Sequence, residues 1–178
     1  MKVLGLVGSP RKGGNTDILV SAVLYGAGAS NYEIEKVFLY DADILPCVDC
    51  RKCKKGVFQC VLKDDMKLLY PKLEKAEVII FGTPLYWYGP SAKMKLTVDR
   101  LRPFIASKKL RGKKVVLVVP SEEGAKACGS LVSMFESSFM YLGMVLAGKI
   151  LVQASEKGEV KKQPKVLDEA FERGKRLK

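Results

Sequence analysis

Apolar segments rich in β-branched residues alternate with amphipathic segments along the whole chain. Five of the apolar segments are expected to be strands, at residues 2–8, 32–39, 77–82, 113–119 and 145–152. The amphipathic segments at residues 15–27, 64–75, 91–105, 129–142 and 165–176 have the periodicity of helices. This alternation predicts an α/β protein with a parallel sheet and helices on both faces.

Two of the expected strands are apolar without interruption, from Val78 to Phe81 and from Val115 to Val119. Strands with this pattern are buried on both faces, so these two are expected at the centre of the sheet. Five strand-helix units predict a flavodoxin-like three-layer sandwich of strand order 2-1-3-4-5, formed by residues 1–178 as one domain. Ligands of such folds bind outside the carboxyl ends of the strands, which directs attention to the loops after strands one, three and four.

The chain has no histidine, which excludes Ser-His-Asp and Cys-His catalysis and histidine-containing zinc sites. Its formal charge of +12 suits nucleic acid, an anionic cofactor or an acidic protein, and does not choose among them. No run of about 18 apolar residues is present and the first segment reads as a buried strand, so we expect a cytoplasmic protein with no membrane partner. In a reducing compartment, five cysteines indicate metal or redox chemistry.

The loop after the first strand, from Gly8 to Thr16, combines two hydroxyls, two cations and backbone amides at the start of a helix. Such a helix start binds anions; a glycine-rich turn capped by Asn15 or Thr16 is the alternative interpretation. The loop lacks both the Gly-Lys-Ser/Thr ending of a Walker loop and the Gly-x-Gly-x-x-Gly dinucleotide fingerprint. Both of these nucleotide-binding motifs are therefore disfavoured.

This loop resembles the Gly-Ser-x-Arg-x-x-x-Asn-Thr phosphate loop of the NADPH-dependent FMN reductase superfamily. The resemblance implies that the FMN phosphate is held by Ser9, Arg11, Asn15 and Thr16. A second motif is similar to that superfamily's Pro-x-Tyr flavin loop followed by a Lys-x-x-x-Asp-Arg helix. Its last two residues here, Asp99 and Arg100, are interpreted only as structural support around the site or a subunit interface.

Three aromatic residues, Tyr86, Trp87 and Tyr88, follow one another in the loop after the third strand. They cannot all face one interior, so some are expected at the surface, where they suit a flat heteroaromatic ring better than core packing. The expected flavin contacts are Pro84, Leu85, Tyr86, Trp87, Tyr88 and Gly89, with Ser121 from the loop after strand four. Beyond that loop, Cys128 is expected to be a small buried residue rather than a ligand.

Four cysteines, Cys47, Cys50, Cys53 and Cys60, lie in a long connection at residues 40–63 after the second strand. Two successive Cys-x2 repeats let one short loop surround an iron-sulfur cluster, whereas structural zinc more often uses two separated Cys-x2-Cys pairs. The spacing therefore favours iron-sulfur over zinc. It also resembles that of the iron-sulfur flavoproteins, a branch of the FMN reductase superfamily. This resemblance implies a [4Fe-4S] cluster on these four cysteines, non-covalent FMN, and a homodimer or homotetramer in which cluster and flavin lie near across an interface.

The main functional hypothesis is an FMN-dependent oxidoreductase that passes electrons between the cluster and FMN, with ferredoxin implied as the donor by the resemblance. Cations among the cysteines would steer such an acidic carrier, with a solvated basic loop as the alternative: Arg51, Lys52, Lys54 and Lys55. A second hypothesis is an NAD(P)H-dependent FMN or quinone reductase with structural zinc. A third, disfavoured one is a nucleic-acid-binding zinc module with stacking aromatic residues, so no nucleic-acid partner is expected.

Overall fold

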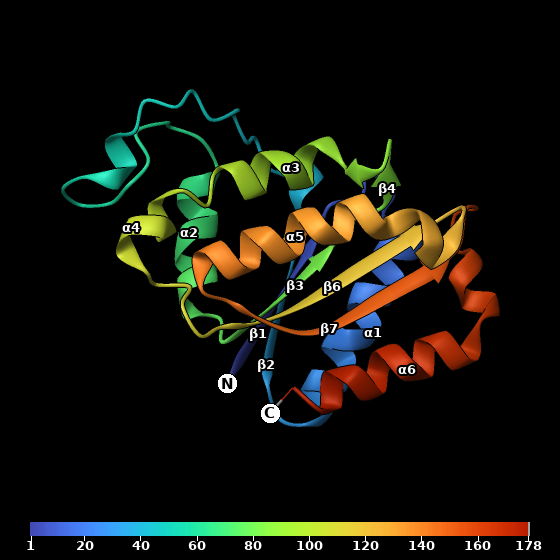
Figure 1. The fold of residues 1–178 in the computed structure, drawn as a ribbon. Coiled ribbons are helices and arrows are strands. Elements are labelled where there is room, and N and C mark those ends of the chain that lie inside the picture. Colours follow the sequence, from blue (N-terminus) through green and yellow to red (C-terminus); the bar gives the residue numbers. More distant parts are fainter. Residues whose placement is uncertain (178) are drawn as a thin grey trace.

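The five apolar segments form one parallel sheet in the computed structural model, which describes residues 1–177 (Figure 1). The strands are β1 (Lys2–Val7), β2 (Glu33–Phe38), β3 (Val78–Gly82), β6 (Lys114–Ser121) and β7 (Val145–Gln153). Their order across the sheet is β2-β1-β3-β6-β7, and each neighbouring pair is parallel. The predicted flavodoxin-like fold and its strand order 2-1-3-4-5 are therefore confirmed.

Burial along the strands follows their position in the sheet. Every residue of β3 is buried, and so is every residue of β6 after Lys114. Both strands have neighbours on each side and helices over each face, as their uninterrupted apolar runs predicted. The edge strand β2 instead has charged residues and no fully buried position. The sheet thus places its most apolar strands at the centre, where their side chains are largely removed from water.

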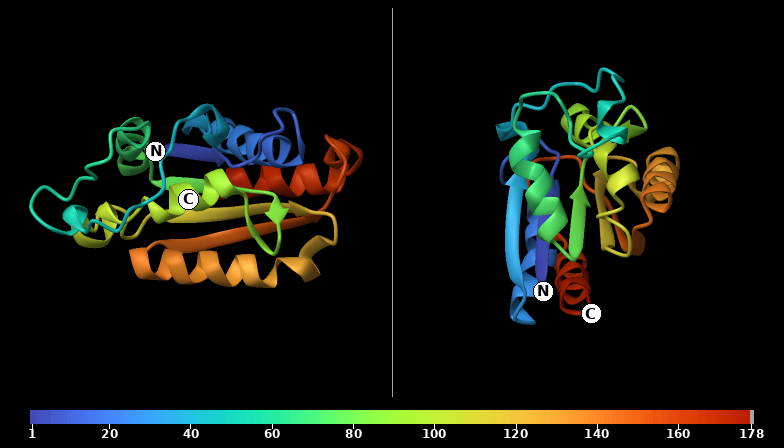
Figure 2. Two further views of the ribbon diagram at one scale, coloured as in Figure 1. Left: turned by 90° about the horizontal axis from the view of Figure 1, so that it is seen from above. Right: turned by 90° about the vertical axis from the view of Figure 1, so that its left-hand side faces the viewer.

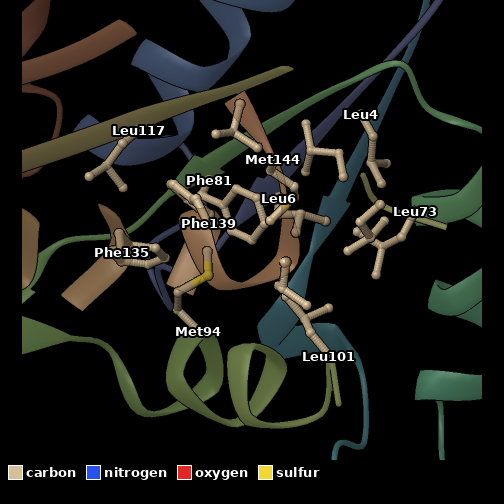
Figure 3. Close-up of a cluster of buried hydrophobic side chains, with 14 of the residues drawn as sticks. Leu4, Leu6, Leu73, Phe81, Met94, Leu101, Leu117, Phe135, Phe139 and Met144 are labelled. Atoms are coloured by element: carbon tan, nitrogen blue, oxygen red, sulfur yellow. The ribbon is translucent and has the colours of Figure 1, made fainter. Parts of the chain in front are cut away.

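Two layers of helices cover the two faces of the sheet (Figure 2). One layer consists of α1 (Asn15–Ala29) and α6 (Pro164–Lys175), which share an apolar core with one face of the strands. The other face is covered by α2 (Met66–Lys75), α3 (Ala92–Asp99), α4 (Pro103–Ser107) and α5 (Gly129–Leu142). The core under α5 centres on Phe81, Phe135 and Phe139 (Figure 3), and the ring centroids of Phe81 and Phe139 lie 5.0 Å apart.

Local differences from the expected elements occur between β3 and β6. The single helix expected at 91–105 is wrong, because α3 ends at Asp99 and α4 begins at Pro103. Proline has no N–H to donate to the preceding turn, whereas it is well suited to the first position of a new helix. A short antiparallel hairpin, β4 (Leu85–Tyr86) and β5 (Gly89–Pro90), occupies the expected loop after β3.

The connection between β2 and α2 contains the four clustered cysteines and only short 3-10 turns, η1 (Leu39–Asp41) and η2 (Lys52–Lys54). Two further 3-10 turns, η3 (Gly124–Cys128) and η4 (Glu159–Lys162), precede α5 and α6. The cysteine loop, residues 40–63, projects at one end of the molecule, and the β4–β5 hairpin lies toward the other (Figures 1 and 2). None of the helices within residues 1–177 combines the length and apolar character needed to cross a membrane.

Candidate functional site

A cavity of about 250 Å3 lies at the carboxyl ends of β1, β3, β6 and β7. We call it the cofactor cavity. It brings together eight residues expected from the sequence to contact a flavin: Ser9, Arg11, Asn15, Thr16, Pro84, Leu85, Tyr86 and Ser121. The expected contacts Trp87, Tyr88 and Gly89 do not line it. The remaining lining residues are Pro120, Glu122, Ala154, Ser155 and Lys157.

The start of α1 supplies the polar wall of the cofactor cavity. Gly14 is the N-cap residue and has no side chain, so the first turn has no side-chain cap. The alternative of a helix capped by Asn15 or Thr16 is therefore not observed. Thr16 is buried, as is Ser9 in the preceding loop. Uncapped first-turn amides, a helix dipole and two hydroxyls around one cavity together favour an anionic ligand.

The first turn also contains an acidic residue, Asp17, but both oxygens of its carboxylate already have partners. One oxygen, Asp17 Oδ2, accepts the Gly13 N–H at 2.8 Å, and this bond shapes the glycine turn. The other, Asp17 Oδ1, lies 2.8 Å from Lys36 Nζ of β2. The lysine charge offsets the carboxylate, so the net charge at this helix start is not negative.

Two polar side chains connect the loop after β1 to the segment after β7. The amide of Asn15 donates to the Glu156 carbonyl at 2.8 Å, and its oxygen accepts the Val160 N–H at 3.2 Å. Arg11 Nη1 lies 3.5 Å from the Ser155 carbonyl oxygen, a long contact that leaves most of the guanidinium available. Asn15 therefore holds the cavity wall together, whereas Arg11 remains able to bind a ligand.

The β4–β5 hairpin presents one aromatic residue to the cofactor cavity and two to solvent. Its two-residue turn is formed by Trp87 and Tyr88, whose φ values of 49° and 60° are those of a type I′ turn. Trp87 is 97% exposed and Tyr88 58% exposed, while Tyr86 lines the cavity. The expectation that some of the three rings lie at the surface is confirmed. The rings differ because Tyr86 belongs to β4 whereas Trp87 and Tyr88 form the turn, a distinction that sequence clustering alone does not reveal.

The start and end of this hairpin are tied to the end of β1 by buried hydroxyls. Thr83 Oγ1 accepts the Ser91 N–H at 3.0 Å, and Ser91 Oγ donates to the Gly8 carbonyl. The turn that follows β3 is thereby fixed beside the loop that follows β1. These contacts keep the hairpin at a constant position relative to the start of α1.

The cavity residues missed by the sequence reasoning come mainly from the segment after β7. Ala154, Ser155 and Lys157 follow the fifth strand, whose carboxyl end lies at the same edge of the sheet as those of the other strands. The parallel order of the strands was therefore a usable signal for them. Cys128 is fully buried, as expected, with its Sγ 3.4 Å from the Gly124 carbonyl oxygen.

The four cysteines of the cysteine loop differ in exposure. Cys53 is buried, Cys50 is exposed, and Cys47 and Cys60 are intermediate. Within residues 1–177 no three histidine, cysteine or acidic side chains converge as a metal site. Burial raises the pKa of the Cys53 thiol, as do Cys60, Cys47 and Cys50, while Arg102 lowers it. Four thiols in one short loop are the donor set that a soft metal ion or an iron-sulfur cluster binds, as thiolates.

Left-handed backbone conformations shape the same loop. Asp49, Arg51 and Phe58 have φ between 46° and 59°, besides Gly56 at 66°. Residues with a side chain rarely adopt this conformation, and it turns the neighbouring peptide groups sharply. Asp49 is held by Arg102 at 2.6 Å and by Arg51 at 3.3 Å. The loop therefore has a defined path although it contains almost no regular secondary structure.

Comparison with known proteins gives consistent results for the whole chain. The family model described as NADPH-dependent FMN reductase matches residues 1–158. An iron-sulfur flavoprotein of Methanocaldococcus jannaschii is 34% identical over 150 residues, which cover 83% of this chain and 76% of that protein. An iron-sulfur flavoprotein of Archaeoglobus fulgidus is 37% identical over 114 residues, covering 64% of this chain and only 51% of that protein.

Further similarities extend over the full length. A putative NAD(P)H-dependent FMN-containing oxidoreductase of Bacillus subtilis is 27% identical over 178 residues, covering 96% of this chain and 94% of that protein. Among solved structures, the Trp repressor binding protein from Bacillus subtilis has a TM-score of 0.72 at 25% identity, covering 100% of this chain and 99% of that one. The NAD(P)H:quinone oxidoreductase from Methanothermobacter marburgensis shares the fold, with a TM-score of 0.75 at 19% identity. The chain thus belongs to the NADPH-dependent FMN reductase family and, within it, to the iron-sulfur flavoproteins, and it is an FMN-dependent oxidoreductase.

Proposed function

We propose that this protein exchanges electrons between FMN in the cofactor cavity and a [4Fe-4S] cluster on Cys47, Cys50, Cys53 and Cys60. The observation that carries the proposal is the presence of two chemically different sites: a polar cavity at an uncapped helix start and a separate loop of four thiols. FMN supplies one- or two-electron exchange when bound, and a cluster supplies single electrons. No side chain with proton-transfer chemistry is needed for this role.

The cofactor cavity contains groups suited to each part of FMN. The buried hydroxyls of Ser9 and Thr16, the first-turn amides of α1 and the Arg11 guanidinium would bind the phosphate. Tyr86 and the neighbouring hairpin residues would contact the ring, because an aromatic side chain beside backbone amides offers both stacking and hydrogen bonds. Asn15 would act indirectly, since its amide is engaged with the segment after β7.

The position of the two sites supports a further part of the proposal. The cysteine loop and the β4–β5 hairpin lie toward opposite ends of one chain (Figures 1 and 2). We therefore propose a homodimer or homotetramer in which the cysteine loop of one subunit approaches the cofactor cavity of another. The exposed cations Arg51, Lys52, Lys54 and Lys55 would attract an acidic donor of the ferredoxin type. A rate of electron uptake that falls with ionic strength would support this attraction.

The proposal is tested by iron, zinc and flavin analysis of anaerobically purified protein, with an absorption spectrum. We expect FMN together with iron and inorganic sulfide in the wild-type protein. Cys50→Ala should lose the cluster absorption and keep FMN, because Cys50 does not line the cofactor cavity. Cys128→Ala is the matched control, since it removes a thiol outside the cysteine loop and should keep both cofactors. Iron that survives in Cys50→Ala at the wild-type level would contradict the ligand assignment.

The full-length similarity to a putative NAD(P)H-dependent FMN-containing oxidoreductase favours a second candidate, a reductase that uses a nicotinamide donor and a structural zinc. The same measurement separates the two candidates. Zinc without iron, together with flavin reduction by NAD(P)H, would replace the electron-transfer proposal with this one.

A further inference from the structure

A buried ion pair joins the two ends of the cysteine loop. Arg100, just after α3, and Asp64, just before α2, have side chains that are 1% and 0% exposed. Arg100 Nη2 donates to Asp64 Oδ1 at 3.0 Å, and Arg100 Nη1 donates to Asp64 Oδ2. Arg100 Nη1 also donates to the Leu45 carbonyl at 2.7 Å, and Asp64 Oδ2 accepts the Leu45 N–H at 2.9 Å. Leu45 precedes Cys47 and Asp64 follows Cys60, so this clamp closes the loop at its base.

Stability alone is a weak reason for such a pair. Removing two charges from water costs about as much as their attraction returns, and apolar residues of similar size often stabilise a protein equally well. Arg100 Nε is also buried without a hydrogen-bond partner, so one of its donors serves no contact within residues 1–177. A buried donor without a partner carries a cost, and within the described chain nothing offsets it.

The guanidinium of Arg100 lies at the base of the cysteine loop, because it donates to the carbonyl of Leu45, two residues before Cys47. Burial lowers the pKa of Arg100, but Asp64, Tyr70 and Cys60 outweigh it and raise that pKa above its ordinary value. The hydroxyl of Tyr70 donates to the Arg100 carbonyl at 2.8 Å. Arg100, Asp64, Leu45 and Tyr70 thus form one contiguous group at the base of the cysteine loop.

We propose that Arg100 is a positioning residue that closes the cysteine loop and places a fixed positive charge at its base, raising the reduction potential of the cluster. This inference rests on the proposed function, because it requires a cluster on the loop. Reduction adds negative charge to the cluster, and a neighbouring cation in a poorly solvated environment stabilises that charge. Asp64 partly offsets the effect, so the two partners act on the potential with opposite signs.

Opposite signs separate this role from a merely structural one. Arg100→Met should lower the cluster potential and Asp64→Asn should raise it, whereas loosening of the loop would move both variants in the same direction. Arg100→Lys keeps the charge without the two-pronged contact, so its potential should remain close to wild type. Its iron should nevertheless be lost to a chelator roughly tenfold faster or more, the usual cost of removing a group that orients metal ligands.

The experiment is a redox titration of the cluster by absorption and electron paramagnetic resonance in the purified, FMN-containing protein. Lys149→Met and Glu136→Gln are matched controls, because they break an exposed ion pair on β7 and α5, at 2.8 Å, and should leave the cluster potential unchanged. The flavin potential is an internal reference in every sample.

Equal cluster potentials in Arg100→Met, Asp64→Asn and wild type would overturn the inference, and so would shifts of the same sign. If Arg100→Met does not fold, loss of FMN will show it. The inference is then tested by the cluster potential of Asp64→Asn, which should be higher than in wild type, and by the rate of iron loss in Arg100→Lys, which should be faster. A wild-type protein without iron would instead refute the proposed function, which keeps the two failures distinguishable.

Discussion

Two adjacent cations in the loop after β1 have different environments, and this difference makes FMN binding testable. Arg11 borders the cofactor cavity and, within residues 1–177, its guanidinium has no carboxylate partner; the one hydrogen bond of its side chain is a 3.5 Å contact with the Ser155 carbonyl. Lys12 lies outside the cavity lining, 2.7 Å from Asp41 and over the ring of Phe38. Arg11→Ala should therefore weaken FMN binding, and Lys12→Ala should not.

The magnitude follows from the contact that is lost. A hydrogen bond between charged groups contributes about 1.5–3 kcal/mol, and each 1.4 kcal/mol changes a dissociation constant about tenfold. Arg11 is exposed, so solvent screening places its contribution in the lower part of that range, and we expect roughly a tenfold weaker FMN affinity. Lys12 contributes an exposed ion pair of about 0–1 kcal/mol to folding and nothing to the cavity.

The assay is a titration of the flavin-free protein with FMN and, in parallel, with riboflavin, followed by quenching of flavin fluorescence. Riboflavin lacks the phosphate, so its affinity should be the same in Arg11→Ala and wild type. An equal loss of affinity for both flavins would show that Arg11 supports the cavity rather than the phosphate. Equal effects of Arg11→Ala and Lys12→Ala would refute the assignment of the phosphate to this wall of the cavity.

Two further predictions concern the scaffold. Gly26→Ala should lower the free energy of unfolding by about 1–3 kcal/mol, because overpacking is costly and the added methyl would lie 1.9 Å from the Phe171 carbonyl oxygen. In the same helix, an added methyl at Gly28 would meet only ordinary contacts, so Gly28→Ala should raise the free energy of unfolding by about 0.5–1 kcal/mol. Urea unfolding that ranks the two variants in the opposite order would contradict both predictions. Hydrogen bonds, first of all from Lys2, lower the pKa of Glu35 in the folded state. Glu35 therefore contributes roughly 1 kcal/mol or less to the free energy of unfolding above its ordinary pKa of 4.5, and this contribution disappears as the pH falls through the lowered value. The difference in unfolding free energy between wild type and Glu35→Gln, measured at successive pH values, should therefore vanish in acid, and a difference that grows there would exclude this linkage.

Local patterns accounted for most of the elements. The apolar runs predicted the five strands and the central position of β3 and β6, because the need to bury both faces is already visible in consecutive side chains. The start of α1 was equally visible, since glycine, hydroxyl and cationic residues adjoin in the chain. The break between α3 and α4 was missed although Pro103 marks it, because the apolar periodicity continues across the proline.

The sequence by itself determined which chemical groups each loop contains: the anion-binding start of α1, the aromatic hairpin and the four closely spaced cysteines. Only the tertiary structure decided which of these groups share a site. It placed Tyr86 in the cofactor cavity and Trp87 in solvent, and it joined Asn15 to the distant segment after β7. It also buried Arg100 between the two ends of the cysteine loop. Contacts between residues far apart in the chain depend on how strands order and helices pack, and no local pattern of side chains encodes that arrangement.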